Sequence, residues 1–523
     1  MPYSRRLVPL LLFAVLFACQ PAEEPDLSNF LALLSQQPDA VFDLWIRHGT
    51  VIDGTGRPAR PADVLIHEDE IAYVGPVDTT AFSARQVIDA AGKVVTPGFI
   101  DAHAHGDPLS APGFHNFLAM GVTTICLGQD GGSPPHEDLR GWMERVDSAG
   151  PGVNIALFAG HGTLRHLSGI GYDTEPAPNE IARMETLLEE ALNAGCFGLS
   201  TGLEYTPGAY AGDAELLALA RVVGAHDGLI MSHVRNEDDD AIEASLRELL
   251  RHGRHCHVHA SHLKVVYGKG VERAEAILTL LDSARQATPF RVTADVYPYT
   301  ASYTGIGIVF PKWAKAPNDY EAVVRDRRKE LLTFLRRRIA ARNGPGATLF
   351  GTPPYAAQTL AAVARQQEIP FEEVLLRIGP TGASGAYFIM DEPLQARLLR
   401  DPHVVVSSDG SPTMHHPRGY GSFAKIIQTY VREQGALSLE EAIHKMSGLT
   451  AAIIGLPDRG VLAAGQKADI IVFDPAQVQA VADFSAPHRL ARGFEWVIVN
   501  GAVAWKEGQG EEGRGKMLRK PKN

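Results

Sequence analysis

The 523-residue sequence predicts an α/β protein: a (β/α)8 TIM-like barrel with a small β-sandwich domain built from both termini. Two observations predict this fold. The middle of the chain alternates short apolar runs with amphipathic helical stretches, a pattern typical of parallel β/α units, and eight such units close a barrel. Both ends are instead rich in short strands separated by glycines, which favours a sandwich assembled from the two ends.

Composition and charge exclude some classes of function. Hydrophobic residues make up 45% of the chain and charged residues 21%, which are ordinary values for a globular protein. The net charge of −12 argues against a nucleic-acid partner. The four cysteines, at positions 19, 126, 196 and 256, have neither zinc-ribbon nor disulfide-framework spacing, so the last three are expected to be buried free thiols.

The first 19 residues predict a signal peptide of the lipoprotein type. Arg5 and Arg6 precede an apolar run, residues 7–18, that is too short to span a membrane. The run ends at Cys19 and resembles a bacterial lipoprotein processing site. The chain is therefore predicted to be exported and held at the periplasmic face of a bacterial membrane through Cys19. An ordinary signal peptide is the alternative, and both Tat and Sec export stay open.

The segments next to the termini predict the sandwich. Residues 20–41 are a predicted tether, residues 42–96 the N-terminal part and residues 461–512 the C-terminal part. Asn500-Gly501 is typical of a hairpin turn. Residues 513–523 are basic and predict a frayed tail. The predicted strands are 43–47, 50–52, 63–67, 70–75, 86–89, 93–96, 468–473, 496–499 and 502–505.

Residues 97–460 predict the barrel. Helical periodicity is clear over residues 180–193 and 240–252. More than a hundred residues separate the last two strands, which predicts an insertion at about 305–400, with helical stretches at 320–342 and 355–377, that covers the site. The predicted barrel strands are 98–103, 123–127, 154–158, 197–200, 229–232, 257–261, 291–296 and 404–407.

Polar side chains follow these strands, where the site of such a barrel lies. His103 and His105 are one residue apart at the end of a buried strand, so they point the same way. One such pair is weak evidence in a chain with 20 histidines, but several strand ends that deliver imidazole or carboxylate favour a metal site. Imidazole and carboxylate without thiolate favour Zn²⁺. The other strand-end residues are Asp130, His161, Glu204, His233, His262, Lys264, Tyr297 and Asp409.

Ten ordered motifs between residues 97 and 452 extend this pattern, and the match to a known family covers roughly residues 42–510. The chain resembles the N-acyl-D-amino-acid deacylases (D-aminoacylases) of the amidohydrolase superfamily. The motifs that carry the resemblance are Pro97-Gly-Phe-Ile-Asp-Ala-His-Ala-His, Gly121-Val-Thr-Thr, Gly160-His-Gly-Thr-Leu-Arg, Leu199-Ser-Thr-Gly, Ser232-His-Val-Arg-Asn-Glu, Ser261-His-Leu-Lys, Asp295-Val-Tyr-Pro-Tyr, Ser408-Asp-Gly, His416-Pro-Arg and Met446-Ser-Gly-Leu-Thr-Ala-Ala.

The resemblance implies a role for each site residue. It implies that His233 and His262 hold one tightly bound Zn²⁺, and that His103 and His105 line a second, weaker or vacant metal position. Asp409 matches the general base. Lys264, Tyr297 and Arg418 match positions that hold the α-carboxylate of the substrate, and His161 is carried over as a further substrate-binding residue that, like Tyr297, is a candidate to stabilise the oxyanion.

One position departs from the family pattern. The well-known D-aminoacylases have Gly-Asn-Cys-Gly after the second strand, with the thiolate as a zinc ligand, whereas this chain has Gly128-Gln-Asp-Gly. Asp130 is predicted to ligate metal in place of the cysteine, which would weaken the selectivity for Zn²⁺ over Mn²⁺ or Co²⁺ and let Asp130 bridge two metals. The alternative is that Asp130 only hydrogen-bonds a metal-bound water.

The expected function is metal-dependent hydrolysis of N-acyl-D-amino acids, small-molecule substrates, with no nucleic-acid partner and membrane contact only through the lipid anchor. A dipeptidase or cyclic amidase of the same superfamily is the alternative. Cyclic amidases usually carry a carboxylated lysine at the fourth strand, and residues 195–205 contain no lysine. A lipid-anchored binding lipoprotein is the non-enzyme alternative.

Overall fold

Two parallel sheets occupy the middle of the chain. The structure is a computed structural model that describes residues 41–77, 83–511 and 513–521. The predicted signal peptide, Cys19 and nearly all of the predicted tether lie outside the described residues. One sheet contains β6 (Phe99–Asp101), β7 (Val122–Leu127) and β8 (Asn154–Leu157). The other has the order β17-β13-β12-β11-β10-β9 and consists of β9 (Ala159–Gly160), β10 (Gly198–Gly202), β11 (Leu229–His233), β12 (His257–Ala260), β13 (Val292–Val296) and β17 (Val404–Val406).

The two sheets meet at both pairs of edges. Only Phe158 separates β8 from β9, so together they occupy one strand position. At the other edges a parallel bridge pairs Ala104 with Gly410, and the His105 N–H donates to the Gly410 carbonyl at 2.7 Å. These eight strand positions are consistent with the predicted barrel.

Helices connect the barrel strands. Two of them, α5 and α7, correspond to predicted helical stretches: α5 (Pro178–Ala194) has Pro178 in its first turn and ends at Gly195, whose φ of 117° is left-handed. In α7 (Ile242–His252), Ile242, Leu246 and Leu249 are buried at helical spacing. The others are α2 (His115–Leu118), α3 (Leu139–Ala149), α4 (His161–Leu167), α6 (Asp213–Ala225), α8 (Val271–Ala287), α13 (Glu392–Leu399), α14 (Arg418–Lys425), the π-helix η5 (Ile426–Glu433), α15 (Leu439–Met446) and α16 (Gly448–Ile454), with the short η1 (Gly208–Tyr210).

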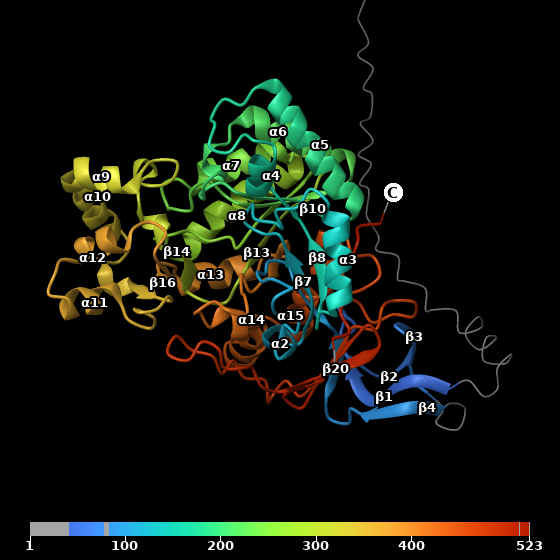
Figure 1. The fold of residues 1–523 in the computed structure, drawn as a ribbon. Helices are drawn as coiled ribbons and strands as arrows, with labels where there is room; N and C mark the ends of the chain where they lie inside the picture. The colour runs from blue at the N-terminus through green and yellow to red at the C-terminus, as the bar shows by residue number, and fades with distance from the viewer. Residues whose placement is uncertain (1–40, 78–82, 512, 522–523) are drawn as a thin grey trace, which may run out of the picture. The chain divides into compact units, whose positions relative to one another are not determined.

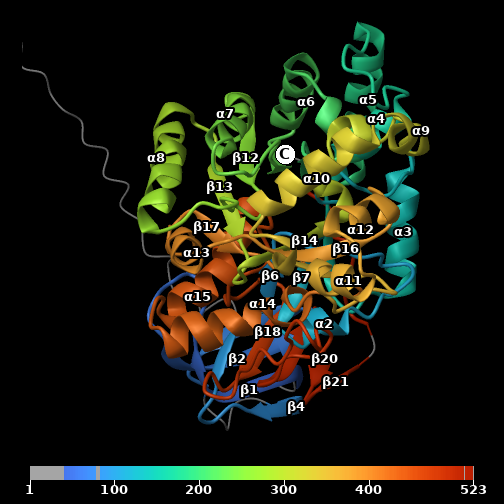
Figure 2. The same cartoon turned by 90° about the vertical axis from the view of Figure 1, so that its left-hand side faces the viewer.

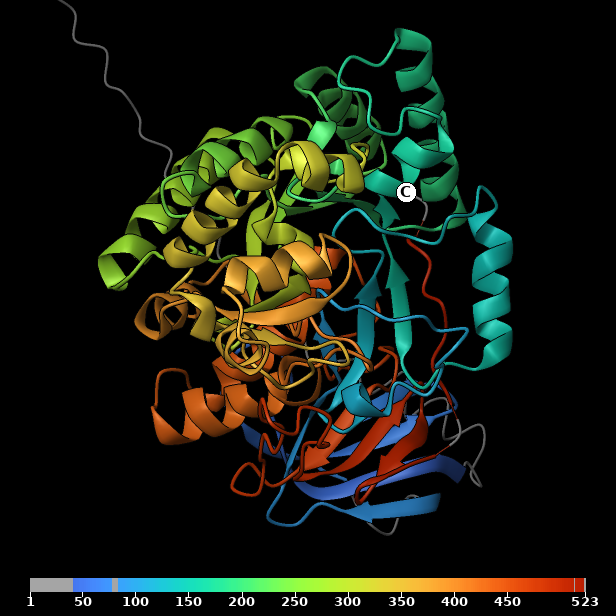
Figure 3. The same cartoon turned by 60° about the vertical axis from the view of Figure 1, so that its left-hand side comes forward.

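Strands from both ends of the chain form one nine-stranded sheet, in blue and red in Figure 3. Antiparallel pairing of β5 with β18 joins the two ends, and Val95 faces Val472. Asn500 and Gly501 both have positive φ between β19 and β20, as a tight hairpin turn requires. The strands are β1 (Val41–Val51), β2 (Arg60–His67), β3 (Glu70–Gly75), β4 (Ser83–Asp89), β5 (Val94–Pro97), β18 (Ile470–Phe473), β19 (Phe494–Val499), β20 (Ala502–Lys506) and β21 (Gln509–Gly510).

The segment between β13 and β17 carries its own sheet and core. The antiparallel strands β14 (Ala301–Gly305), β16 (Ser384–Phe388) and β15 (Thr348–Phe350) were not predicted. The helices beside them in Figures 1 and 2 lie in or next to the two predicted helical stretches. They are α9 (Tyr320–Asp326), α10 (Arg328–Ala341), α11 (Leu360–Gln366) and α12 (Phe371–Ile378), with the short η2 (Ile306–Val309), η3 (Lys312–Ala314) and η4 (Pro345–Ala347). A separate apolar cluster, which includes Leu331, Leu335 and Phe350, holds them together.

The prediction of a frayed C-terminal tail is wrong for residues 513–521. The Ile155 N–H donates to the Lys516 carbonyl at 2.9 Å, and the Leu518 N–H donates back to Ile155 at 2.8 Å. Met517 is buried because the tail runs along β8. Cys126, Cys196 and Cys256 are buried free thiols, as predicted. Within the described ranges no helix combines the length and apolar composition of a membrane span.

Candidate metal centre

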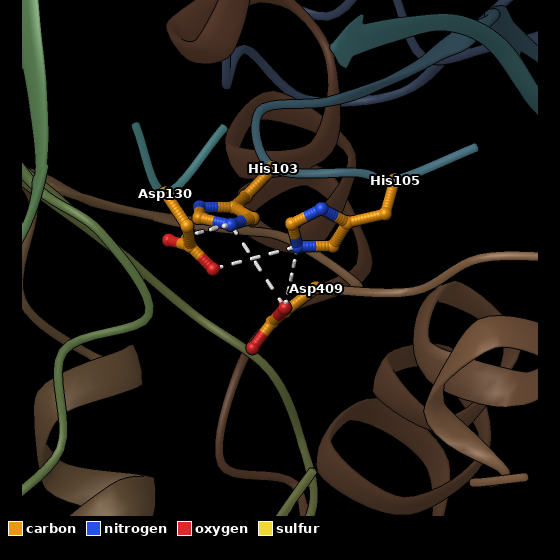
Figure 4. A group of neighbouring side chains, drawn as sticks. All are labelled: His103, His105, Asp130 and Asp409. Atoms are coloured by element: carbon orange, nitrogen blue, oxygen red, sulfur yellow. Dashed lines mark hydrogen bonds and ion pairs between the residues drawn. The ribbon is translucent and has the colours of Figure 1, made fainter. Parts of the chain in front are cut away.

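Two histidines and two carboxylates meet where β6, β7 and β17 end (Figure 4). Nε2 of His105 lies 3.1 Å from Oδ1 of Asp409 and 3.6 Å from Oδ2 of Asp130. Nε2 of His103 lies 3.4 Å from Oδ1 of Asp130 and 3.8 Å from Oδ1 of Asp409. The four potential ligand atoms all lie within 4.8 Å of one another, so this group could hold a metal ion.

A second group adjoins the first at the ends of β11 and β12. Nδ1 of His233 is 3.0 Å from Nε2 of His262, which in turn is 3.2 Å from Oδ1 of Asp130. Asp130 therefore belongs to both groups: its Oδ1 faces His103, His233 and His262, and its Oδ2 faces His105. Glu204 lies 3.2 Å from Nε2 of His233 on the far side of that ring.

The donors fit a divalent metal. His103 is completely buried, yet neither of its ring nitrogens has a hydrogen-bond partner among the described residues. A buried imidazole without partners is costly, and a metal ion would satisfy it. Imidazole and carboxylate suit zinc, and the count of four histidines and one shared carboxylate suits two adjacent ions.

The backbone is strained at three residues of this cluster. Asp130, His262 and Asp409 have φ values of 54°, 37° and 48°, in the left-handed region that side-chain-bearing residues seldom adopt. Such conformations persist where surrounding structure enforces them and cluster at functional sites. Here they turn the chain sharply after a strand, which aims each side chain into the cluster instead of along the barrel axis.

The cluster opens into a cavity of about 350 Å³ between the barrel mouth and the inserted segment. Arg418 lines it, and its Nη1 lies 2.8 Å from Oδ2 of Asp409. Burial would raise the pKa of Asp409, but the Arg418 guanidinium and the hydrogen bond from His105 outweigh burial and hold this pKa below its usual range. Asp409 is therefore a carboxylate, the form that accepts a proton.

Lys264 lines the same cavity and supports the histidines. Its Nζ lies 2.6 Å from Oε1 of Glu237 and 2.7 Å from Nδ1 of His262. Burial would lower the pKa of Lys264, but Glu237 outweighs burial and raises it, so the amine is charged. Glu237 Oε1 also lies 3.3 Å from Nδ1 of His262. Metal-binding histidines commonly have a carboxylate at their other ring nitrogen, which fixes the ring.

Tyr297 is close to the cavity but is not among the residues that line it. Its ring lies under the Arg418 guanidinium, 4.7 Å from the centroid, and Lys264 Nζ is 5.9 Å from the same ring. Its hydroxyl faces Sδ of Met390 at 3.6 Å. The structure thus places Tyr297 behind the two cations that the resemblance assigns to the substrate carboxylate.

The structure does not bring His161 to this cavity. The chain enters α4 directly after β9, and this turn aims His161 away from the cluster, so its Nε2 lies 2.6 Å from Oε1 of Glu215. Arg165 reaches the other Glu215 oxygen at 2.5 Å, and all three residues are buried. The roles of His161 in substrate binding and oxyanion stabilisation stay predictions, and the structure places the residue outside the lining of this cavity. We assign this residue to a buried ionic cluster.

Replacing Glu215 with Gln should destabilise the fold rather than the chemistry. The change leaves the Arg165 guanidinium buried without its counter-ion, which costs about 3–5 kcal/mol. We expect a lower denaturation midpoint in guanidinium chloride and near-normal kcat/KM for the molecules that stay folded.

The matched control is Glu137→Gln, because Glu137 pairs with Arg183 at 2.8 Å on the surface. Exposed pairs contribute about 0–1 kcal/mol, so its midpoint should barely move. If Glu215→Gln lowered kcat/KM without changing the denaturation midpoint, this cluster would have a role in catalysis.

Glu237 and Arg342 are among the cavity residues that escaped the sequence analysis. Glu237 is the last residue of the motif that begins at Ser232, but the motif does not indicate that its carboxylate faces His262. Arg342 follows α10 in the inserted segment and reaches the cavity wall, where its guanidinium stacks 5.2 Å from the Tyr387 ring. No sequence pattern predicts this position, because it depends on how the insertion packs over the barrel.

Comparison with known proteins agrees with this geometry. A family model described as an amidohydrolase family matches residues 352–504. The N-acyl-D-glutamate deacylase of Alcaligenes xylosoxydans xylosoxydans is 35% identical over 504 residues, which cover 91% of this chain and 96% of that protein. The D-aminoacylase of the same organism is 33% identical, with coverage of 91% and 96%.

Solved structures give the same relationship. The crystal structure of N-acyl-D-glutamate deacylase from Bordetella bronchiseptica, complexed with zinc and a phosphonate that mimics the tetrahedral intermediate, has a TM-score of 0.79 and 33% identity, and covers 92% of this chain and 100% of that one. A D-aminoacylase structure with a binuclear metal centre, described by one-metal activation and second-metal attenuation, matches with the same TM-score and identity over 91% of this chain and 100% of that one. A D-hydantoinase shares only the fold, at 18% identity and a TM-score of 0.56 over 92% of this chain and 99% of that one.

Proposed function

The chain belongs to the N-acyl-D-amino-acid deacylase family of amidohydrolases, and on this premise we propose which reaction it catalyses. The protein is a zinc-dependent amidohydrolase that cleaves the amide of N-acyl-D-amino acids into a carboxylate and a free D-amino acid. The relatives are named for N-acyl-D-glutamate and for D-aminoacyl substrates. The observation that carries the proposal is one ionised acid, Asp409, beside two metal-binding groups that share Asp130.

His233, His262 and Asp130 would hold one metal, and His103, His105 and Asp130 would hold a second. Zinc is the metal in the Bordetella relative. A bound metal supplies an activated water at neutral pH, because it lowers the pKa of water from 15.7 to about 7, and it polarises the carbonyl. Glu237 keeps His262 in its ligating orientation, because its Oε1 can accept from Nδ1–H and leave Nε2 for the metal, and Lys264 holds Glu237 at 2.6 Å.

Asp409 is the proton carrier. Its Oδ1 faces the histidine cluster at 3.1 Å from His105 Nε2, and Arg418 holds its Oδ2 at 2.8 Å. Oδ1 accepts the proton of the attacking water and then delivers it to the departing amide nitrogen. One water is consumed, the C–N bond breaks, and the proton ends on the amine.

Arg418 and Lys264 bind the α-carboxylate of the substrate. Both line the cavity; Nη1 of Arg418 contacts Asp409, and Nε makes no hydrogen bond to the described residues. A guanidinium in a buried wall matches a carboxylate, because it carries several donors in a planar fork. Tyr297 supports both cations through its ring.

A panel of N-acetyl-D- and N-acetyl-L-amino acids tests the function. With Zn²⁺, Mn²⁺ or Co²⁺ added in turn, we expect kcat/KM to be at least ~100-fold higher for D than for L enantiomers, because misplaced groups leave the buried cations unpaired. Equal rates on both enantiomers, or cleavage of hydantoins and dihydropyrimidines only, would favour the cyclic-amidase alternative. Absence of bound or activating metal would favour a binding lipoprotein.

We further propose that the chain is exported and carries a lipid on Cys19. The support is the sequence alone, with Arg5 and Arg6 before a short apolar run that ends at this cysteine. Labelling with radioactive palmitate in a bacterial host tests it: the label should disappear in Cys19→Ser. Label that persists in this variant would place the lipid elsewhere.

The terminal sheet is proposed to be a separate β-sandwich domain. Along β18, Ile470 and Val472 belong to a cluster confined to the terminal segments, whereas Ile471 and Phe473 pack in the cluster shared with the barrel. Alternate side chains of a strand point to opposite faces, so the sheet is apolar on both. A sheet with two apolar faces needs a second layer, and the coiling of the sheet on itself would supply it.

A further inference from the structure

A second cavity adjoins the metal cavity at Asp130. It has a volume of about 380 Å³, and Asp130 and Tyr205 line both cavities. The Tyr205 ring stands between them, 4.5 Å from the His233 ring, and its hydroxyl accepts a hydrogen bond from Thr304 at 3.2 Å. The carboxylate that links the two metal groups therefore also marks the boundary between two separate spaces.

The two cavities differ in charge. The metal cavity is lined by Lys264, Arg342 and Arg418 together with several carboxylates. The second cavity is lined mostly by glycine, proline, threonine and tyrosine residues, and among the described residues Asp130 and His166 are the titratable acidic or basic groups in its wall. The metal cavity therefore stabilises the charged end of a ligand. A neutral, apolar group can enter the second cavity at a low cost in free energy, because few side-chain charges must be desolvated there.

An N-acyl-amino acid extends in two directions from the carbonyl carbon that water attacks. Under the proposed function, Arg418 and Lys264 hold the carboxylate end in the metal cavity, so the acyl chain must leave past Asp130 on the other side. We propose that the second cavity is the acyl-chain subsite and takes neutral acyl groups longer than acetyl. Tyr172, 41% exposed at its rim, supplies an aromatic face for such a chain.

Backbone, not side chains, forms much of its wall. Gly131 has a φ of +76°, and a Cβ there would come within 2.9 Å of the Gly202 nitrogen, so the two strand-end loops approach closely. Gly132 is different: an added Cβ meets only the Gln129 carbonyl oxygen, at 3.6 Å, which is ordinary contact. A larger side chain at position 132 therefore fits the backbone and would occupy space that the acyl chain needs.

The test uses full-length protein and a series of N-formyl-, N-acetyl-, N-butyryl- and N-hexanoyl-D-leucine. For the wild type we expect kcat/KM to rise from acetyl to hexanoyl, by up to about fourfold for each methylene that the cavity buries. For Gly132→Leu we expect formyl and acetyl substrates to stay within about threefold of wild type and hexanoyl to fall at least ~10-fold. Tyr172→Ala should reduce the increase of kcat/KM with acyl-chain length, and hydrolysis of the acetyl substrate should persist.

Gly346→Leu is the matched control, because a Cβ at Gly346 meets nothing within 4 Å and the residue lines neither cavity. Binding of hexanoate compared with acetate, measured by isothermal titration calorimetry, gives a readout that does not need turnover: the preference for hexanoate should disappear in Gly132→Leu. An unchanged chain-length profile in both cavity variants would overturn the subsite. A wild type that hydrolyses no N-acyl-D-amino acid at all would instead overturn the proposed function.

Discussion

Replacement of Asp409 with Asn lowers kcat by ~10³-fold or more and leaves the metal content near that of the wild type. General acid–base catalysis contributes about 10²–10⁴-fold, and Asp409 is expected to act in both proton transfers. Asparagine has the same shape but no site that takes up a proton at neutral pH. The Arg418 guanidinium, 2.8 Å from Asp409, loses its charged partner as well.

The measurement combines turnover of an N-acetyl-D-amino acid with the metal content of the purified protein. Asp89→Asn is the control, because this exposed carboxylate forms ion pairs with Arg47 and His48 on the terminal sheet, far along the chain from the cluster residues. Retained turnover in Asp409→Asn would assign the base to another group. Loss of metal with loss of turnover would make Asp409 chiefly a ligand.

The strands that carry these residues are predictable because burial is nearly complete along them. All six residues of β7 and all five of β11 are buried, so their sequences are almost uninterrupted apolar or small residues. A titratable side chain within a few residues of the end of such a run, as His105 after β6 or Asp409 after β17, stands out. The prediction that these ends meet then follows from the parallel arrangement, in which all carboxyl ends lie at one mouth.

The inserted segment shows where sequence reasoning stops. In β14 four of five residues are at least partly exposed and its pattern is mixed, and it pairs with β16 about eighty residues later, so only tertiary contacts stabilise it. The same applies to Arg342, whose position follows from that packing. The prediction of a frayed tail was wrong for a similar reason. Met517 is a single apolar residue in a basic stretch, and its burial depends on contact with β8.

His161 illustrates the limit of reasoning from strand ends. It follows β9 as His233 ends β11, and both occur in motifs of the resemblance. The difference is the next element: α4 begins at His161 itself, and Glu215 and Arg165 supply a buried ion cluster for its side chain. The contact of His161 with Glu215 depends on how α6 packs against α4, which the position after a strand does not predict.

Replacement of Asp130 with Asn should remove metal from both groups at once. Oδ1 of Asp130 lies 3.2 Å from His262 Nε2 and 3.4 Å from His103 Nε2, and its Oδ2 lies 3.6 Å from His105 Nε2. Burial would raise the pKa of Asp130, but His103 and His262 hold it well below the usual range, so the side chain is an anion. The neutral amide removes that charge from between two cations, and we expect metal affinity to fall by at least ~100-fold, since even residues behind the ligands contribute 10–100-fold.

Metal stoichiometry during dialysis against a chelator measures this, with Asp238→Asn as the control. Asp238 lines the same cavity but belongs to neither metal group and pairs with Arg338. Asp130→Cys tests ligand type apart from charge, because a thiolate keeps the negative charge but is a softer ligand than a carboxylate. This variant should retain zinc and be more active with Zn²⁺ than with Mn²⁺ or Co²⁺. Normal stoichiometry in Asp130→Asn would mean that the carboxylate only hydrogen-bonds a water, and the four histidines would then hold the metals without it.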